Sequence, residues 1–380
     1  MNVGIVALDI HAADEVIVEA VRGQAADLGI APERVLVNWS HTHCGPAVRR
    51  SRDAVLNGQF DEDYLSELTG KLTALLRDAA AGLREARLDY TVGSCTMGIN
   101  RRRPGTTNLL PNADKPIDTD VPVMRVLTPD GDVRAVLFSY ACHPTVMGGR
   151  RIGPDYVGPA MDLLREAIPG CVPVFLQGCG GDIKPRNVTA DGTFASGSLE
   201  AVGEFGRELG RAVLAALCGT PEALGPHLAG AGAVIDLPTQ GTPGEDVLAA
   251  CEKGPHWQKA WVSAVRRTIA EKGRLADVMP VEVQALDIGG LCIVGLPGEI
   301  FCRIGLELKE KLPDRKLWTL GYANQQRYVV SRDTHAESGS LFDPNFIYCL
   351  TPSPCPLGLK PESVDVILSK SLDLARAVQA

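Results

Sequence analysis

The alternation of two kinds of segment along this chain most constrains its fold. Short runs rich in valine, isoleucine and leucine are typical of strands, and longer segments with a 3.6-residue apolar period are typical of helices. Strands are predicted at residues 3–8, 34–39, 88–99, 121–128, 133–140, 172–177, 228–237, 281–295 and 317–322. Helices are predicted at residues 12–28, 61–84, 157–168, 198–218, 244–273, 300–312 and 362–378. This order predicts an α/β fold, a layered domain with a mixed, substantially parallel sheet.

Two tight turns indicate that part of the sheet is antiparallel. Residues 128–132 read Thr-Pro-Asp-Gly-Asp, which is strong turn chemistry between two predicted strands. Gly289-Gly290 interrupts the predicted strand at 281–295 in the same way. We therefore expect a hairpin at each of these positions.

Composition excludes several classes of function. No stretch of the 380 residues approaches the ~18 consecutive apolar residues of a membrane span. The formal net charge is −8, and Arg101–Arg103 is the basic run that stands out, so nucleic acid is a poor partner. Oligomeric state has no visible signal.

The cysteines and the first residues indicate a compartment. The 11 cysteines are odd in number and form no C-x-x-C pair, which argues against a disulfide scaffold and for a reducing environment. The start shows no basic region and no small-residue cleavage site, so no signal peptide is visible. We expect a cytoplasmic protein, with secretion possible if the true start lies upstream of Met1.

A histidine pair follows the predicted strand at 34–39. His41 and His43 lie in the segment Ser-His-Thr-His-Cys-Gly-Pro. Side chains two residues apart on a strand share a face, so both rings are predicted to enter one cleft at the carboxyl end of the strand. The structural alternative is a pair that only caps the strand.

Two more strand ends carry possible metal ligands. His143 ends the apolar run 137–142, and Pro144 stops the strand there. Glu299 follows a strand and Pro297-Gly298, and we expect it to start a helix. Two imidazoles and one oxygen ligand are typical of a catalytic zinc site. From spacing alone, Glu299 is equally well explained as an acid stabilised by the helix dipole.

The other histidines have no comparable setting. We interpret His11, His227 and His256 as surface or capping residues, whereas His335 lies in a long late loop near which a site could form.

The glycine-rich segment 177–185 also follows a predicted strand. Its simplest interpretation is a tight loop in which Asp182 hydrogen-bonds the backbone or a ligand histidine. A thiol enzyme using Cys179, or a nucleotide-binding loop, is a weaker alternative, because no activating partner or phosphate-binding motif is present.

Taken in order, these segments resemble the neutral/alkaline, non-lysosomal ceramidases, zinc amidases that cleave the N-acyl bond of ceramide. Ser40–Pro46 is similar to the family's S/T-H-T-H-S-G-P signature. The other similar segments are Asn100-Arg101, Ala141–Thr145, Asp155–Gly158, Gln177–Pro185, Leu296–Glu299 and Gln326–Val329. The likeness covers most of the chain.

The resemblance implies a Zn²⁺ ion held by four ligands: His41, His143, Glu299 and Tyr328. It further implies that His43 lies beside the metal and that Arg101 contacts the substrate near the scissile group. A bound metal lowers the pKa of water towards ~7 and polarises an amide carbonyl, and a nearby imidazole can move the proton. The expected activity is zinc-dependent hydrolysis of a small-molecule N-acyl or lipid-like substrate.

The sequence also departs from the family. Lys184 stands where the family has a serine, and residues 331–343 offer no clear match for a further tyrosine. Residues 1–380 are expected to form a single catalytic domain that lacks the start of the N-terminal sheet and the C-terminal immunoglobulin-like domain. A non-catalytic metal- or ligand-binding protein on a degenerate ceramidase-like fold is the alternative.

Overall fold

The computed structural model describes residues 2–46, 48, 60–106, 109–147, 151–337 and 358–379. The helices are Glu15–Asp27 (α1), Glu62–Ala81 (α3), Val157–Ala167 (α4), Leu199–Leu217 (α5), Glu245–Cys251 (α6), His256–Lys272 (α7), Cys302–Lys311 (α8), Arg332–Glu337 (α9) and Ser363–Ala377 (α11). The strands up to residue 200 are Gly4–Leu8 (β1), Val35–Trp39 (β2), Arg87–Ser94 (β3), Gly98–Asn100 (β4), Asp120–Leu127 (β5), Val133–Tyr140 (β6), Val172–Gln177 (β7) and Ile183–Pro185 (β8). The later strands are Glu222–Ala223 (β9), Leu228–Pro238 (β10), Val278–Ile288 (β11), Leu291–Gly295 (β12), Glu299–Ile300 (β13), Lys316–Leu320 (β14) and Tyr328–Val329 (β15).

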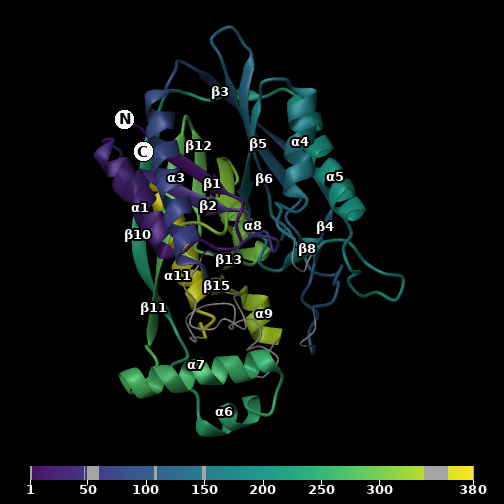
Figure 1. Cartoon of the computed structure of the whole chain (residues 1–380), viewed down its shortest axis with the longest axis vertical. Helices are drawn as coiled ribbons and strands as arrows, with labels where there is room; N and C mark the ends of the chain where they lie inside the picture. Colours follow the sequence, from purple (N-terminus) through teal and green to yellow (C-terminus); the bar gives the residue numbers. More distant parts are fainter. Residues whose placement is uncertain are drawn as a thin grey trace.

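The predicted mixed α/β fold is confirmed, with the strands divided among several sheets (Figure 1). One sheet has the order β7-β6-β5-β3-β9, and another has the order β10-β11-β12-β14. Parallel pairs join β1 to β2, β6 to β7, β12 to β14 and β13 to β15. The antiparallel pairs include the β5–β6 and β11–β12 hairpins, and also strands far apart in the chain, such as β4 with β8 and β3 with β9. Helices α4 and α5 pack together over the first sheet, and α11 packs on β10 and β11.

Both predicted hairpins are confirmed. Residues 128–132 turn between β5 and β6, where the Thr128 carbonyl accepts a hydrogen bond from the Gly131 amide (3.0 Å). Gly289-Gly290 turns between β11 and β12. The predicted strand at 88–99 is instead two strands, and the predicted helix at 244–273 is broken between α6 and α7. Pro255 lies at this break and cannot continue a helical hydrogen-bond ladder.

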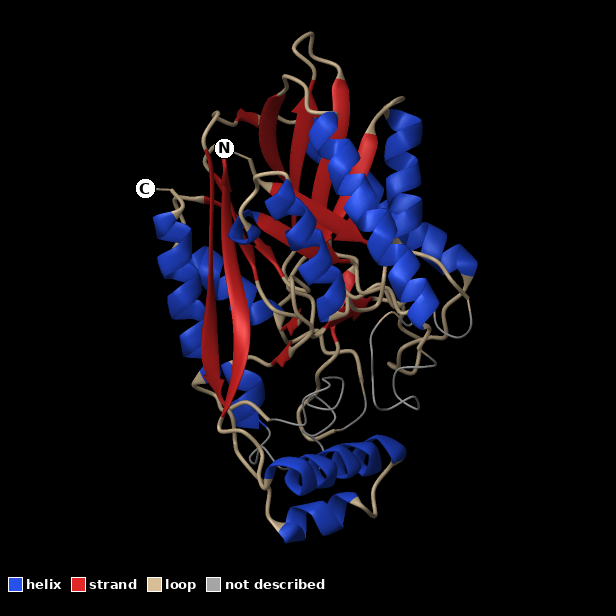
Figure 2. Ribbon diagram, turned by 60° about the vertical axis from the view of Figure 1, so that its left-hand side comes forward, coloured by secondary structure: helices blue, strands red, loops and turns tan. Residues whose placement is uncertain are grey.

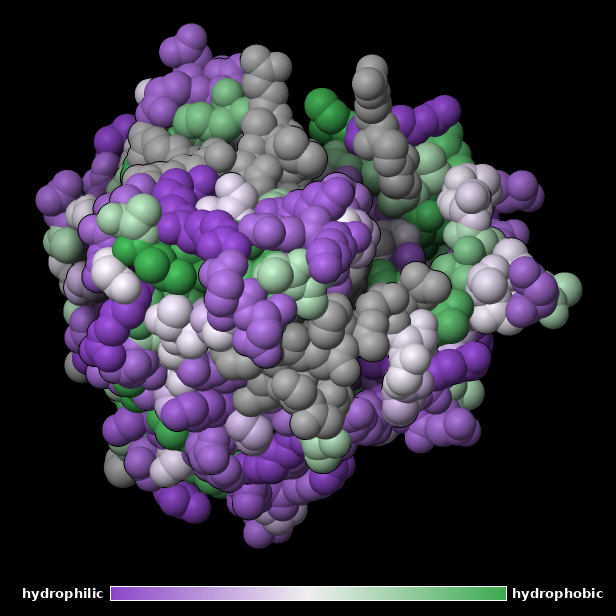
Figure 3. Space-filling view, turned by 90° about the horizontal axis from the view of Figure 1, so that it is seen from below, coloured by the Kyte–Doolittle hydropathy of each residue, from purple (hydrophilic) through white to green (hydrophobic). Residues whose placement is uncertain are grey.

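The long β10–β11 ribbon carries α6 and α7 at its far end (Figure 2). Seen from below, this end of the molecule is mostly hydrophilic, with small scattered hydrophobic groups (Figure 3). Among the described residues, no helix combines the length and apolar character needed to cross a lipid bilayer.

The strand ends that carry the predicted site residues converge on one region. Asn38, in β2, bridges to Ala323, and Gly178, after β7, bridges to Leu320 at the end of β14. Because β1 and β2 run parallel, the segments that follow both strands leave from the same edge. The predicted location of the site at strand carboxyl ends therefore has a structural basis in these pairings.

Gly298 has the backbone that lets Glu299 reach this region. Its φ is +75°, and a Cβ atom there would lie 2.2 Å from the backbone nitrogen of Arg327. Only glycine combines this φ with so close an approach of two chains. The Pro297-Gly298 break is thus a requirement for pairing β13 with β15.

We predict that Gly298→Ala destabilises the protein by about 3 kcal/mol or more, because it adds a backbone collision to an unfavourable φ. Gly273→Ala is the matched control: Gly273 has φ +79° and no atom near the added methyl group, so its cost should be about 1–2 kcal/mol. Chemical denaturation of both variants measures the difference. Equal losses of stability in the two variants would mean that the close approach of Arg327 does not restrict the residue at position 298.

Candidate metal centre

Three buried side chains from different strand ends meet at one point. His41 follows β2, His143 follows β6, and Glu299 lies in β13. The Nε2 atom of His41 is 3.5 Å from Oε1 of Glu299, and the Nε2 atom of His143 is 3.2 Å from Oε2. All three residues are at most 4% exposed. The structure therefore brings together three of the four predicted ligands.

Backbone carbonyls orient both imidazoles. The Nδ1 atom of His41 donates to the His11 carbonyl at 2.6 Å, and the Nδ1 atom of His143 donates to the Gly180 carbonyl at 2.6 Å. Since a carbonyl can only accept, each ring carries its proton on Nδ1. Both Nε2 lone pairs therefore face the carboxylate, which is the usual arrangement for metal-ligating histidines.

The Glu299 carboxylate is oriented in the same way. Its Oε1 atom accepts from the Gln326 amide at 3.1 Å, and the Gln326 oxygen accepts from the Trp39 indole at 3.3 Å. This chain of hydrogen bonds holds one carboxylate oxygen in place with groups outside the ligand set.

The donor set fits a metal ion such as Zn²⁺. Bonds of ~2.0–2.1 Å in a tetrahedral site separate ligand atoms by about 3.3 Å, close to the observed 3.2 and 3.5 Å. Burial lowers the pKa of both His41 and His143 well below its usual value, and a nearby cationic side chain, Arg101, adds to the effect at His143. Both rings are consequently neutral at pH 7, the form that binds metals.

Arg101 lies beside the buried group, and its predicted contact with the substrate stays a prediction. Its Nη2 atom donates to the Gly181 carbonyl at 2.7 Å and lies 3.1 Å from Nε2 of His143. The same atom is 3.6 Å from Oε2 of Glu299. A guanidinium so close to the ligand atoms can also reach an oxygen of a bound substrate.

Two tyrosines lie at the site. Tyr328 pairs in register with Glu299 through β13 and β15, and its hydroxyl is 3.5 Å from the Gly181 carbonyl that Arg101 also contacts. The second is Tyr322, which the sequence did not predict as a site residue. Its hydroxyl is 3.5 Å from Nε2 of His143, and its ring centroid lies 4.6 Å from that of His41. Its position just after β14, another strand end, was the available signal. The role of Tyr328 as fourth ligand stays a prediction.

His43 meets His41, but not for the predicted reason. Their Nε2 atoms are 3.3 Å apart, yet both residues lie beyond the end of β2, and His41 has φ +62°. A turn, not a shared strand face, therefore brings the rings together. His43 is exposed, whereas His41 is buried, so His43 lies on the solvent side of the group.

The interpretation of His11 as a surface or capping residue is wrong. Its ring stacks on that of His41 with centroids 4.5 Å apart and meets the edge of His43 at 4.7 Å. The missed signal is its place after β1, which pairs in parallel with β2. His227 and His256 do lie on the surface, and His335 is buried in α9, where burial lowers its pKa to about 4.

The expectation that Glu299 starts a helix is also wrong. Glu299 lies in β13, where it pairs with β15, and α8 begins only at Cys302. Glu299 is therefore not an acid in the first turn of a helix, and the helix-dipole explanation does not apply to it.

The glycine-rich segment lies against the site, where the carbonyls of Gly180 and Gly181 accept hydrogen bonds from His143 and Arg101. Asp182 accepts from the Asn100 side chain and the Cys302 amide, both at 2.7 Å, which confirms its predicted backbone contact. Burial raises the pKa of the Cys179 thiol, which argues against a nucleophilic thiolate. Lys184 is half-buried with its ammonium 4.6 Å from the Phe194 ring centroid, and burial lowers its pKa.

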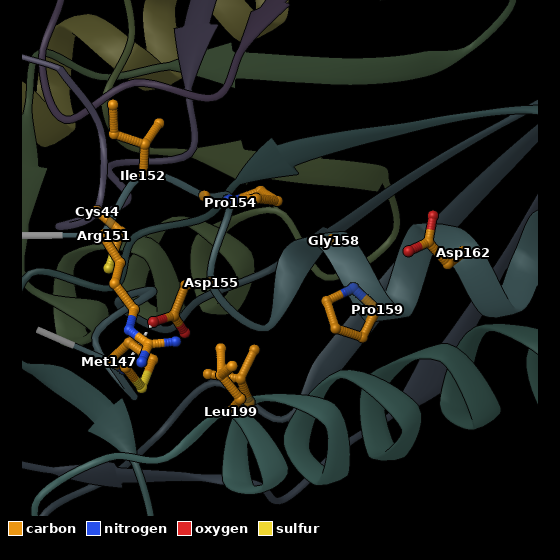
Figure 4. A pocket seen from close by; sticks show the side chains of 12 residues that line it. Cys44, Met147, Arg151, Ile152, Pro154, Asp155, Gly158, Pro159, Asp162 and Leu199 are labelled. Carbon is orange, nitrogen blue, oxygen red and sulfur yellow. Dashed lines mark hydrogen bonds between the residues drawn. The ribbon is translucent and has the colours of Figure 1, made fainter.

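A mainly apolar cavity of about 560 Å³ adjoins the site (Figure 4). Cys44, the residue after His43, lines one end, and helices α4 and α5 line the other with Pro159 and Leu199. At its rim, Ile152 is 83% exposed and Leu199 is 62% exposed. Such an apolar rim suits a ligand with a hydrocarbon chain.

From the predicted role of Tyr328 as a fourth ligand, we expect Tyr328→Phe to weaken zinc binding about 100-fold or more. Tyr322→Phe is the matched control, since it removes the other buried hydroxyl and should cost about tenfold or less. Competition titrations with a chelator measure both affinities. A larger loss in Tyr322→Phe would assign the fourth ligand to Tyr322 instead.

Solved structures share this fold. A crystal structure of neutral ceramidase from Pseudomonas aeruginosa matches with a TM-score of 0.73 and 18% identity, over 98% of this chain and 65% of that chain. A structure described as ceramidase complexed with C2 matches with a TM-score of 0.73 and 19% identity, over 98% and 66%. This chain thus spans about two thirds of their length. No protein-family model matches the sequence, and no curated protein matches it significantly. The chain has a neutral ceramidase-like fold, with a buried histidine–glutamate group spaced to hold a metal ion.

Proposed function

We propose that this protein is a zinc-dependent amidohydrolase that cleaves an N-acyl bond in a lipid-like substrate. The observation that carries the proposal is the buried group of His41, His143 and Glu299, with its Nε2 lone pairs directed at one carboxylate. The likeness of the fold to ceramidases supports a hydrolase. The identity of the ion and the amide specificity are inferred from the donor set and from the family resemblance.

The expected chemistry divides among few residues. When bound, zinc supplies a water of pKa near ~7 and polarises a carbonyl. His43 takes the proton from the attacking water and delivers it to the leaving nitrogen. Arg101 donates hydrogen bonds to the charge that develops on the scissile carbonyl oxygen. Gln326 and the carbonyls of His11 and Gly180 keep the ligand side chains in their orientations.

The cavity supports a substrate with an apolar chain. It begins one residue beyond His43 and is rimmed by Ile152 and Leu199. An acyl chain that enters it removes hydrocarbon from water at ~0.8 kcal/mol per methylene group. A substrate with its carbonyl near His43 and its acyl chain between α4 and α5 would fit the metal site and the cavity together.

The alternative, a non-catalytic metal- or ligand-binding protein, remains distinguishable by experiment. Zinc-dependent turnover of any N-acyl substrate would exclude it. A cytoplasmic location and a single catalytic domain also stay predictions.

We predict that His43→Ala keeps near-stoichiometric zinc and lowers the hydrolysis rate ~10²–10⁴-fold, because a proton-transfer group is lost while the ligands remain. His41→Ala should lose both zinc and activity. Metal analysis of the purified variants, with rates on an N-acyl substrate, tests the pair. If His43→Ala releases zinc and His41→Ala retains it, the two roles are exchanged.

We predict that Leu199→Asp raises the KM for a long-chain N-acyl substrate about tenfold or more and leaves an N-acetyl analogue unaffected, because it replaces apolar lining with a charge in addition to those of Arg151, Asp155 and Asp162. Leu83→Asp is the matched control: Leu83 is 64% exposed, does not line this cavity, and should show no change. Equal KM values for all three proteins on the long-chain substrate would remove the cavity from the substrate site.

A further inference from the structure

We propose that His11, His41 and His43 form a second, outer binding site for a transition-metal ion, on the solvent side of the buried group. One ligand nitrogen from each ring lies within 4.8 Å of those from the other two. The two groups share His41, so the molecule contains two overlapping triads. This site goes beyond the hydrolytic function, since it needs no substrate and neither His143 nor Glu299.

The ring geometry supports coordination by the outer triad. The Nε2 atoms of His41 and His43 are 3.3 Å apart, the separation of two ligands on one tetrahedral zinc ion. The His11 ring stacks on the His41 ring with centroids 4.5 Å apart and meets the His43 ring edge-on at 4.7 Å. His11 is therefore close to both rings, and it turns to direct a nitrogen at an ion that the other two hold. Imidazole ligands suit transition-metal ions such as Zn²⁺ or Cu²⁺, whereas Mg²⁺ and Ca²⁺ require oxygen ligands.

The three rings differ in their exposure to solvent, which gives the order in which an incoming ion meets them. His43 is exposed, His11 is partly buried, and His41 is 1% exposed. An ion that arrives from solvent therefore meets His43 and His11 before it reaches His143 and Glu299. The outer triad therefore binds an incoming ion first, and His41 is the ligand that it shares with the buried group.

The shared ligand also makes the two sites interdependent. The Nδ1 proton of His41 is donated to the His11 carbonyl, so both triads must use the same Nε2 atom. When the buried site is filled, His11 and His43 are left to hold an outer ion by themselves, and they bind it more weakly. When the buried site is disabled, the outer triad keeps all three imidazoles.

Equilibrium dialysis against increasing Zn²⁺ concentrations tests the proposal by the number of ions that each protein binds. The wild type should bind one tight ion and a second at least ~100-fold more weakly. His11→Ala should bind only the first. The double variant His143→Ala/Glu299→Gln should still bind one ion, and adding His11→Ala to it should abolish that binding. His256→Ala, which removes an exposed imidazole at the start of α7, should behave as the wild type.

His43→Ala provides an independent arm, since the residue is exposed and its replacement should not disturb folding. It should also lose the second ion, with circular dichroism showing a native fold. The proposal is overturned if His11→Ala and His43→Ala both bind two ions, or if the double variant binds none. Failure of the hydrolase would look different: no turnover, with His11-dependent zinc binding intact.

Discussion

The side chain of Asn38 holds together the strand ends on which the candidate site depends. It is fully buried, its Oδ1 atom accepts from the Gln177 amide at 2.7 Å, and its Nδ2 atom donates to the Gly321 carbonyl at 2.7 Å. These contacts join β2 to the ends of β7 and β14. A buried amide that lost either partner would cost about 1–3 kcal/mol, so the arrangement of the three chain segments is strongly constrained. His41 follows three residues after Asn38 and takes its position from this junction.

Backbone strain is concentrated beside the same junction. Among the described residues, the non-glycine positions with positive φ are His41, Asp155, Tyr322 and Asn324. Such conformations cost ~1–3 kcal/mol each and persist only where the surroundings enforce them. Here the Asn324 side chain accepts from the Val37 amide at 3.0 Å, which ties one strained segment directly to β2. Three of the four positions, His41, Tyr322 and Asn324, lie at this junction, where the rings of His41 and Tyr322 are 4.6 Å apart, whereas Asp155 precedes α4. Strain of this kind is typical of functional sites.

Hydrogen bonds hold the polar groups of the site in fixed orientations. The carbonyls of residues 11 and 180 fix two imidazoles, Gln326 and Trp39 fix one carboxylate oxygen, and Gly181 receives the guanidinium of Arg101. Most of these partners are backbone groups of loops that follow strands. The fold thus determines the tautomers and orientations of the two imidazoles and the carboxylate, and a mainly apolar cavity lies beside Cys44, the residue after His43.

The sequence by itself determined most elements, both hairpins and the placement of His41 and His143 after strands, because apolar period, turn residues and strand-ending prolines act locally. It did not predict the short pairing of β13 with β15, the break between α6 and α7, or the positions of His11 and Tyr322 beside His41. His11 follows a predicted strand, as a capping histidine also could, and only the parallel pairing of β1 with β2 carries it to His41. The strand and Pro-Gly before Glu299 predict a helix start, whereas the strand that pairs with Glu299 begins 29 residues later. Tertiary structure decided these points, since the meeting of strand ends depends on hydrogen bonds between segments far apart in the chain, such as those of Asn38.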